Sequence, residues 1–147
     1  MVGEPGATAH VRDSGPGSLK VAIAVAGQSF AGDEPLSAGG TGCGPAPHDL
    51  LAAGLAECTA LTLRLYADRK GWPLTAIEVE VVHERDSQAS PSDLFRRTVH
   101  LTGELNAEQR ARLLEIAERC PVHRTLTAGS RIETLPGLDV SQRSGAV

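Results

Sequence analysis

Aromatic residues are scarce in this chain: Phe, Tyr and Trp together make up 3% of its 147 residues. The core must therefore consist mostly of Leu, Val, Ile and Ala. Only three Cys occur, at irregular spacings, and no basic segment followed by an apolar run opens the sequence. A structural disulfide framework and a secretion signal are therefore not indicated. The longest apolar stretch is interrupted by Glu57 and Arg64, which argues against a membrane span.

The chain also lacks an excess of basic residues. Its net charge is −4, its pI is about 5.7, and no basic stripe is evident, so nucleic acid is not expected as a partner. Internal repeats and domain boundaries are absent from the sequence as well. We therefore predict one cytoplasmic α+β domain over residues 1–147, with loose tails at 1–8 and 136–147.

Residues 47–72 are predicted to form one long helix. Pro47 suits a first helical turn, and Gly71 suits the left-handed cap just past the end. Glu57 is the one charged residue between positions 50 and 60, so we expect the helix to be buried on most sides. Cys58 lies near its middle, seven residues from both Leu51 and Leu65, and so shares their stripe.

The remaining patterns predict short strands, a hairpin and a second helix. Asn106 and Gln109 have the spacing of a capping box and start the second helix, which has one apolar side. His83 and His100 fall in the hairpin, where solvent-facing or cross-strand positions are expected. The predicted strands are 9–13, 19–26, 28–31, 77–85, 94–105 and 130–135; the second helix is 106–119, and 37–46 is a Gly-rich loop.

Cys120 precedes Pro121, Val122 and His123. Pro121 is well placed to begin a short helix, which makes Cys120 its N-cap or first residue. The free N–H groups and the positive dipole end at that point favour a thiolate. Cys43, in the Gly-rich loop, has no second Cys or His at metal-binding spacing and is interpreted as an incidental thiol.

Two motifs together resemble the OsmC/Ohr family of thiol-dependent hydroperoxide reductases, and its broader OsmC-like branch most of all. One is Gly-Pro-Ala-Pro-His-Asp-Leu-Leu-Ala-Ala, residues 44–53, leading to Cys58; the other is Cys-Pro-Val-His from Cys120. Asp-Glu-Pro at 33–35 adds to the resemblance, which covers about 19–135. It implies an OsmC-like α+β fold, with antiparallel sheets wrapped around two central helices in an intertwined homodimer. The active sites would then lie at the subunit interface.

The resemblance also implies a chemistry that needs no cofactor and no metal. Cys58 would attack an organic hydroperoxide as a thiolate and become a sulfenic acid. Cys120 would condense with it to a disulfide, which an external dithiol would reduce, in defence against oxidative stress.

The residues that would activate the thiol depart from the family pattern, which uses an Arg from the N-terminal part and a Glu ten residues before the first Cys. His48 stands at the position of that Glu and is followed by Asp49, while Arg12 is the one Arg before residue 64. Ten helical residues span about 15 Å, so His48 and Asp49 could reach Cys58 only from a partner subunit or through another group. The candidates for activating the thiol or positioning the substrate are Asp49, His48, His123, Arg124 and Arg12.

Three other interpretations remain. The Cys pair could serve a redox-sensing or small-ligand-binding module with little turnover. A metal could be held by Cys58, Cys120 and His123, with Cys43 or His48, although no ligand spacing supports this. The buried thiols could also be purely structural.

Overall fold

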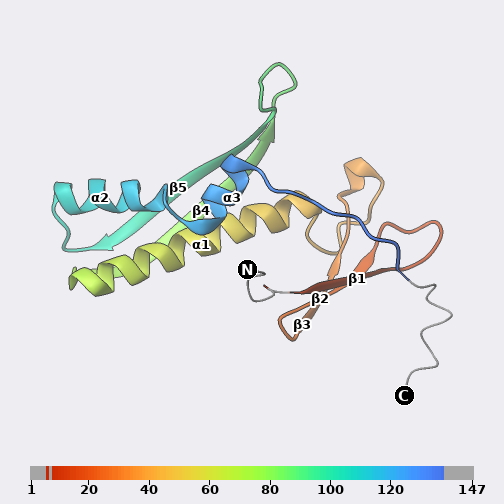
Figure 1. The fold of residues 1–147 in the computed structure, drawn as a ribbon, viewed down its shortest axis with the longest axis horizontal. Helices are drawn as coiled ribbons and strands as arrows, with labels where there is room; N and C mark the ends of the chain where they lie inside the picture. Colours follow the sequence, from red (N-terminus) through yellow and green to blue (C-terminus); the bar gives the residue numbers. More distant parts are fainter. Residues whose placement is uncertain (1–5, 7, 138–147) are drawn as a thin grey trace.

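The structure is a computed structural model that describes residue 6 and residues 8–137. Its axis is the long helix α1 (Pro47–Lys70), which runs beside a long β-hairpin (Figure 1). A separate three-stranded sheet lies beyond the N-terminal end of α1. The α+β class predicted from the sequence is confirmed. The predicted loose tails lie almost entirely outside the described residues.

The N-terminal sheet contains β1 (Ala9–Asp13), β2 (Val21–Val25) and β3 (Gln28–Gly32), in that order and antiparallel. All three strands were predicted. Val11 pairs with Ile23, which pairs in turn with Phe30, so apolar side chains line up across one face. Val11 and Phe30 nevertheless remain exposed, so the described residues leave this face largely uncovered.

The second sheet is the hairpin of β4 (Leu74–Arg85) and β5 (Asp93–Gly103). Every second residue of each strand faces inward, as the alternating pattern predicted. Those side chains pack against α1 and α2 (Ala107–Ala117) around a core of aliphatic residues. The buried members of this core are Leu63, Ala67, Leu74, Leu113, Ile116 and Ala117.

Helix α1 begins and ends as predicted, with Pro47 in its first turn and Gly71 in the left-handed conformation after it. The expectation that it is buried on most sides is wrong for the single chain. Its buried residues follow one stripe, one every four residues, because among the described elements the hairpin and helices α2 and α3 pack mainly against that side. That stripe consists of Leu55, Thr59, Leu63 and Ala67.

Asp33 organises the Gly-rich loop that leads into α1. It is buried and accepts hydrogen bonds from Thr41 Oγ1 at 2.6 Å, from Thr41 N at 3.0 Å and from the N–H groups of Glu34 and Cys43. The Thr41 hydroxyl, with these N–H groups, holds the pKa of Asp33 well below its usual value. A Cβ on Gly40 would overlap the Glu34 carbonyl, so the loop needs glycine in order to close over the carboxylate.

Helices α2 and α3 (Pro121–Ala128) follow the hairpin. The capping box of α2 is confirmed, since Asn106 Oδ1 accepts from Gln109 N and Gln109 Oε1 accepts from Asn106 N. The predicted strand at 130–135 is wrong: these residues form no strand. They run past the last helix toward the N-terminal sheet (Figure 1) but pair with none of its strands, and a strand needs such a partner.

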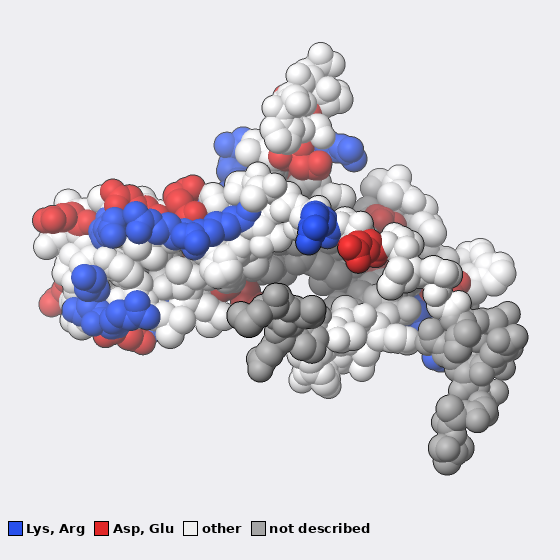
Figure 2. All heavy atoms as spheres, in the orientation of Figure 1, with Lys and Arg blue, Asp and Glu red and all other residues white. Residues whose placement is uncertain are grey.

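The charged side chains on the face shown in Figure 2 gather mainly at the end that carries α2, with both signs present there. Length and composition alone would allow α1 to cross a membrane. The same is true of many core helices, and α1 packs on β4, α2 and α3.

Candidate functional site

Cys120 is the N-cap of α3, as predicted. Its side chain is fully buried, and its Sγ accepts a hydrogen bond from His123 N at 3.3 Å. Thr59 Oγ1, from the buried stripe of α1, lies 3.8 Å from the same sulfur. The Thr59 hydroxyl hydrogen is directed to Leu55 O at 2.7 Å, so a protonated Cys120 is the donor in the Thr59 contact.

Arg97 is the cation of this cluster. Its side chain is 9% exposed and reaches inward from β5. Nη1 donates to Thr59 Oγ1 at 3.0 Å and to Ala117 O at 3.1 Å, and Nη2 donates to Glu118 Oε1 at 3.0 Å. A largely buried guanidinium with its donors satisfied in this way is held firmly in one position.

His123 links Arg97 to Glu118 from the other side. Arg97 Nη2 lies 3.4 Å from His123 Nδ1, and a guanidinium can only donate, so Nδ1 is the acceptor. The ring proton then belongs to Nε2, which lies 3.4 Å from Glu118 Oε2. The sequence suggested that His123 stabilises the Cys120 thiolate; in the structure its backbone N–H donates to the sulfur, and its ring contacts Arg97 and Glu118.

Cys58 immediately precedes Thr59 on α1 and points about 100° away from it around the helix. It is half-buried, whereas Cys120 has no exposed surface. Cys43 is exposed, and all three cysteines are free thiols. The stripe that Cys58 shares with Leu51 and Leu65 is largely open: those two side chains are 45% and 65% exposed.

A pocket of about 540 Å³ lies between the N-terminal half of α1, the start of β5 and α3. Its wall is mostly apolar, with two His and one Asp among the lining residues, and it contains no cysteine. His123 faces both this pocket and the Cys120 cluster. The lining residues are His48, Leu51, Leu55, Pro91, Asp93, Leu94, Phe95, His123, Leu126 and Thr127.

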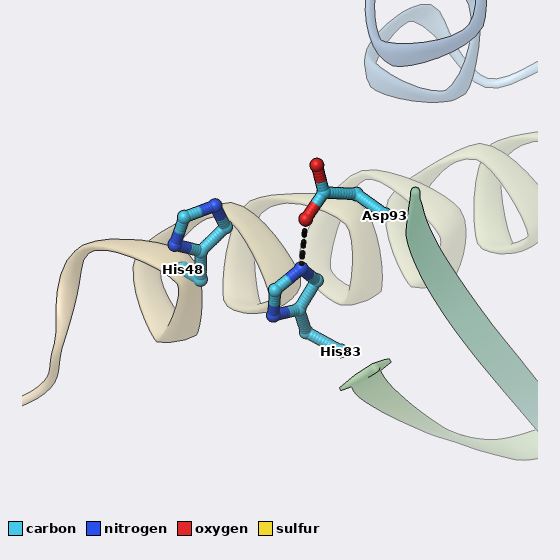
Figure 3. Close-up of side chains that lie close together, drawn as sticks. All are labelled: His48, His83 and Asp93. Atoms are coloured by element: carbon cyan, nitrogen blue, oxygen red, sulfur yellow. Dashed lines mark hydrogen bonds and ion pairs between the residues drawn. The ribbon is translucent and has the colours of Figure 1, made fainter. Parts of the chain in front are cut away.

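One wall of the pocket is formed by His48 and Asp93, with His83 behind them. The His83 Nε2 atom lies 2.8 Å from Asp93 Oδ1, and the His48 and His83 rings stack at 4.4 Å with 13° between their planes. Figure 3 shows the three side chains converging from α1, β4 and β5. The hydrogen bond from His83, with the nearby positive charge of Arg85, lowers the pKa of Asp93.

The other predicted site residues lie elsewhere. Asp49 accepts a hydrogen bond from Ala46 N at 2.9 Å and so caps α1. Arg12 is exposed on β1, in the separate sheet, and Arg124 is exposed on α3. Arg124 N donates to Cys120 O at 3.2 Å, but among the described residues no side-chain hydrogen bond or ion pair joins these three residues to the Cys120 cluster.

The sequence analysis did not identify Arg97, and it expected His83 to be a solvent-facing or cross-strand residue. The strand pattern nevertheless marks both positions. Phe95, Arg97 and Val99 alternate on one face of β5, so a cation stands where the pattern requires an apolar residue. His83 likewise continues the inward-facing series of β4. A polar residue on the buried face of a strand needs partners.

A sequence model of OsmC-like proteins matches residues 39–135. This chain belongs to the OsmC-like protein family. None of the curated proteins matches its sequence. The family match extends over the central helix, the hairpin and both cysteines of interest.

Solved structures share the fold. A protein of Psychrobacter arcticus, described as a putative osmotic stress induced and detoxification response protein, superposes with a TM-score of 0.68 at 20% identity, over 85% of this chain and 91% of its own. The organic hydroperoxide resistance protein OsmC of Legionella pneumophila gives 0.66 at 20% identity, over 84% and 90%. OhrB of Bacillus subtilis, an organic hydroperoxide resistance protein, gives 0.56 at 24%, over 82% and 89%.

Proposed function

We propose that this chain is a cysteine-dependent peroxidase that reduces organic hydroperoxides, in oxidative-stress defence. The observation that carries the proposal is the contrast between the two thiols. Cys58 is half-buried and reachable, whereas Cys120 is fully buried and surrounded by hydrogen-bond partners. Two structural neighbours are described as organic hydroperoxide resistance proteins, which supports organic hydroperoxides as the substrate class.

The reaction divides between the two sulfurs. The Cys58 thiolate attacks one peroxide oxygen, the O–O bond breaks, and the alkoxide takes up a proton to leave as an alcohol. Cys58 is then a sulfenic acid. The Cys120 thiolate attacks that sulfur and expels hydroxide, which forms the Cys58–Cys120 disulfide. An external dithiol reduces this disulfide by exchange and is itself oxidised.

The surroundings of Cys120 suit the second step. As a thiolate, its sulfur keeps the donor of His123 N, and the Thr59 hydroxyl can rotate from Leu55 O to donate to it. Arg97 supports Thr59 from behind with a positive charge. Arg97 therefore supports the Cys120 thiolate, a role that the sequence had sought in His123 or Arg124; Arg12, His48 and Asp49 stay proposals for activating Cys58.

The working unit in this proposal is a homodimer. Within the described chain, α1 leaves Leu61 57% and Leu65 65% exposed, and the face of the N-terminal sheet is also uncovered. A soluble monomer rarely exposes so many contiguous apolar side chains, and a second copy would cover them. It would also bring its own His48 and Asp49 within reach of Cys58, which these residues cannot reach along their own helix.

A second candidate function is a redox-sensing or small-ligand-binding module with little turnover. The apolar pocket favours it, since its walls contain neither Cys58 nor Cys120. A ligand held there would touch His123 and so influence the Cys120 cluster without meeting a reactive sulfur. A cytoplasmic location is expected in both cases, since the thiols must be returned to the reduced state.

The test is thiol loss after addition of one equivalent of cumene hydroperoxide to the reduced protein, with peptide mapping of the product. We expect a rapid Cys58–Cys120 disulfide. The Cys58→Ser variant should lose the reaction, and Cys43→Ser, which changes an exposed thiol in the loop, is the matched control. Two unreacted thiols after long incubation would reject peroxidase activity and leave the binding module in its place.

A further inference from the structure

The cluster of His48, His83 and Asp93 brings three metal-ligating side chains together from three elements. They come from the first turn of α1, from near the end of β4 and from the first residue of β5. One ligand atom from each lies within 4.8 Å of those of the other two. Among the described residues, this is the one group of three or more His, Cys, Asp or Glu side chains with that geometry.

We propose that His48, His83 and Asp93 bind one divalent transition-metal ion, with Zn²⁺ as the simplest example. Two imidazoles and one carboxylate form a common ligand set for Zn²⁺ and Fe²⁺ sites that keep a position open. At bond lengths of about 2.1 Å, ligand atoms on a tetrahedral ion lie about 3.4 Å apart. Binding would draw the widest pair of ligand atoms together by at most about 1.4 Å, from 4.8 to 3.4 Å, and would widen the 2.8 Å His83–Asp93 pair by about 0.6 Å. Side-chain rotation can supply both shifts, because His48 and Asp93 are not buried.

The existing contacts suit a cation. Asp93 contributes a carboxylate oxygen, an anionic ligand of the kind that Zn²⁺ accepts. The His83 Nε2 proton now bridges to Asp93 Oδ1 at 2.8 Å, and the metal would replace that proton between the two atoms. Arg85, the cross-strand partner of Asp93, is the opposing charge; it is exposed and therefore screened by solvent.

The open coordination positions would face the pocket. Both His48 and Asp93 line it, opposite apolar side chains such as Leu126. A ligand with an apolar body and an oxygen donor would fit this combination: its body against the aliphatic wall and its oxygen on the metal. The site differs from the Cys58, Cys120 and His123 set considered from the sequence, which is not among the convergent groups of the described residues.

The competing explanation is a His83–Asp93 pair that fastens the hairpin to the start of α1 through the stacked His48 ring, without any metal. Calorimetric titration of the reduced, metal-free, full-length protein with Zn²⁺ separates the two. We expect one Zn²⁺ ion to bind per chain. We also expect bound Co²⁺ to show strong visible absorption, which indicates a site with four or five ligands. His83→Asn and Asp93→Asn should each weaken Zn²⁺ binding more than about 100-fold, beyond the effect of losing a group that merely hydrogen-bonds to a ligand.

His100→Asn is the matched control, because His100 is an exposed His on the same hairpin. A Cys58→Ser protein should bind Zn²⁺ as the wild type does, which would exclude Cys58 as a ligand. Absence of saturable Zn²⁺ binding, or wild-type affinity in both His83→Asn and Asp93→Asn, would overturn the proposal. Neither result bears on peroxidase activity, which is measured separately through the fate of Cys58 and Cys120.

Discussion

Arg97 Nη1 donates a hydrogen bond to Thr59 Oγ1 at 3.0 Å, and the same oxygen lies 3.8 Å from Cys120 Sγ. A cation on the hairpin is thereby connected, through one hydroxyl of the central helix, to the buried thiol at the start of α3. This relay joins residues 38 and 61 positions apart in the sequence. It makes the environment of Cys120 depend on α1, β5 and α3 at once.

Arg97→Ala should slow formation of the Cys58–Cys120 disulfide by roughly 10- to 100-fold. This range corresponds to the loss of a charged hydrogen-bond donor worth about 1.5–3 kcal/mol. Stopped-flow thiol loss after addition of hydroperoxide measures the effect. Arg96→Ala is the matched control, since the Arg96 side chain is 62% exposed and pairs with Glu84 on the opposite face. If Arg97→Ala and Arg96→Ala formed the disulfide at equal rates, Arg97 would have no role in supporting Cys120.

Thr59→Val should also slow the disulfide step, by about 10-fold, because it keeps the shape of the side chain and removes the hydroxyl between Arg97 and Cys120. It leaves one Arg97 donor without its partner, so we expect a loss of about 1–3 kcal/mol in the free energy of unfolding. Thr59→Ser retains the hydroxyl and should react at close to the wild-type rate. Chemical denaturation and thiol kinetics on the two variants check both statements; a slow Ser variant would contradict them.

Asp33→Asn should lower the melting temperature by roughly 5 °C or more at pH 7, because a carboxylate that accepts four hydrogen bonds is replaced by an amide. The folded-state pKa of Asp33 is lowered. Its contribution to stability is therefore complete above the unfolded value of about 4 and is lost as the pH falls below it. The gap between wild type and variant should narrow as the pH falls from 5 to 2. A gap independent of pH would mean that the ionised carboxylate is not what stabilises the loop.

Leu65→Glu should convert the proposed dimer to a monomer. Light scattering of the wild type should give twice the chain mass of 15.3 kDa, whereas a charge on the exposed stripe of α1 cannot be buried against a second copy. Leu114→Glu, an exposed Leu on α2, serves as the control for the effect of a new charge. A wild-type mass of 15.3 kDa would refute the dimer directly.

The sequence by itself determined the local structure of this protein. Pro47, Gly71, Asn106 and Pro121 mark helix ends by their backbone chemistry, which acts within a few residues, and all four predictions hold. The alternation of inward- and outward-facing residues in the hairpin strands also depends on short-range patterns. So does the role of Cys120 as N-cap. The predicted strand at 130–135 failed because a strand also needs a neighbouring edge, which sequence proximity does not provide.

Only the tertiary structure decided which side chains meet. Arg97 contacts Thr59 because its long side chain reaches from β5 to the buried stripe of α1, and His48 stacks on His83 because the end of β4 lies beside the first turn of that helix. Such contacts arise from packing between elements, which the sequence pattern of each element does not encode separately. The sequence thus determined that Cys120 begins a helix, and the packing decided which cation, hydroxyl and imidazole surround its sulfur.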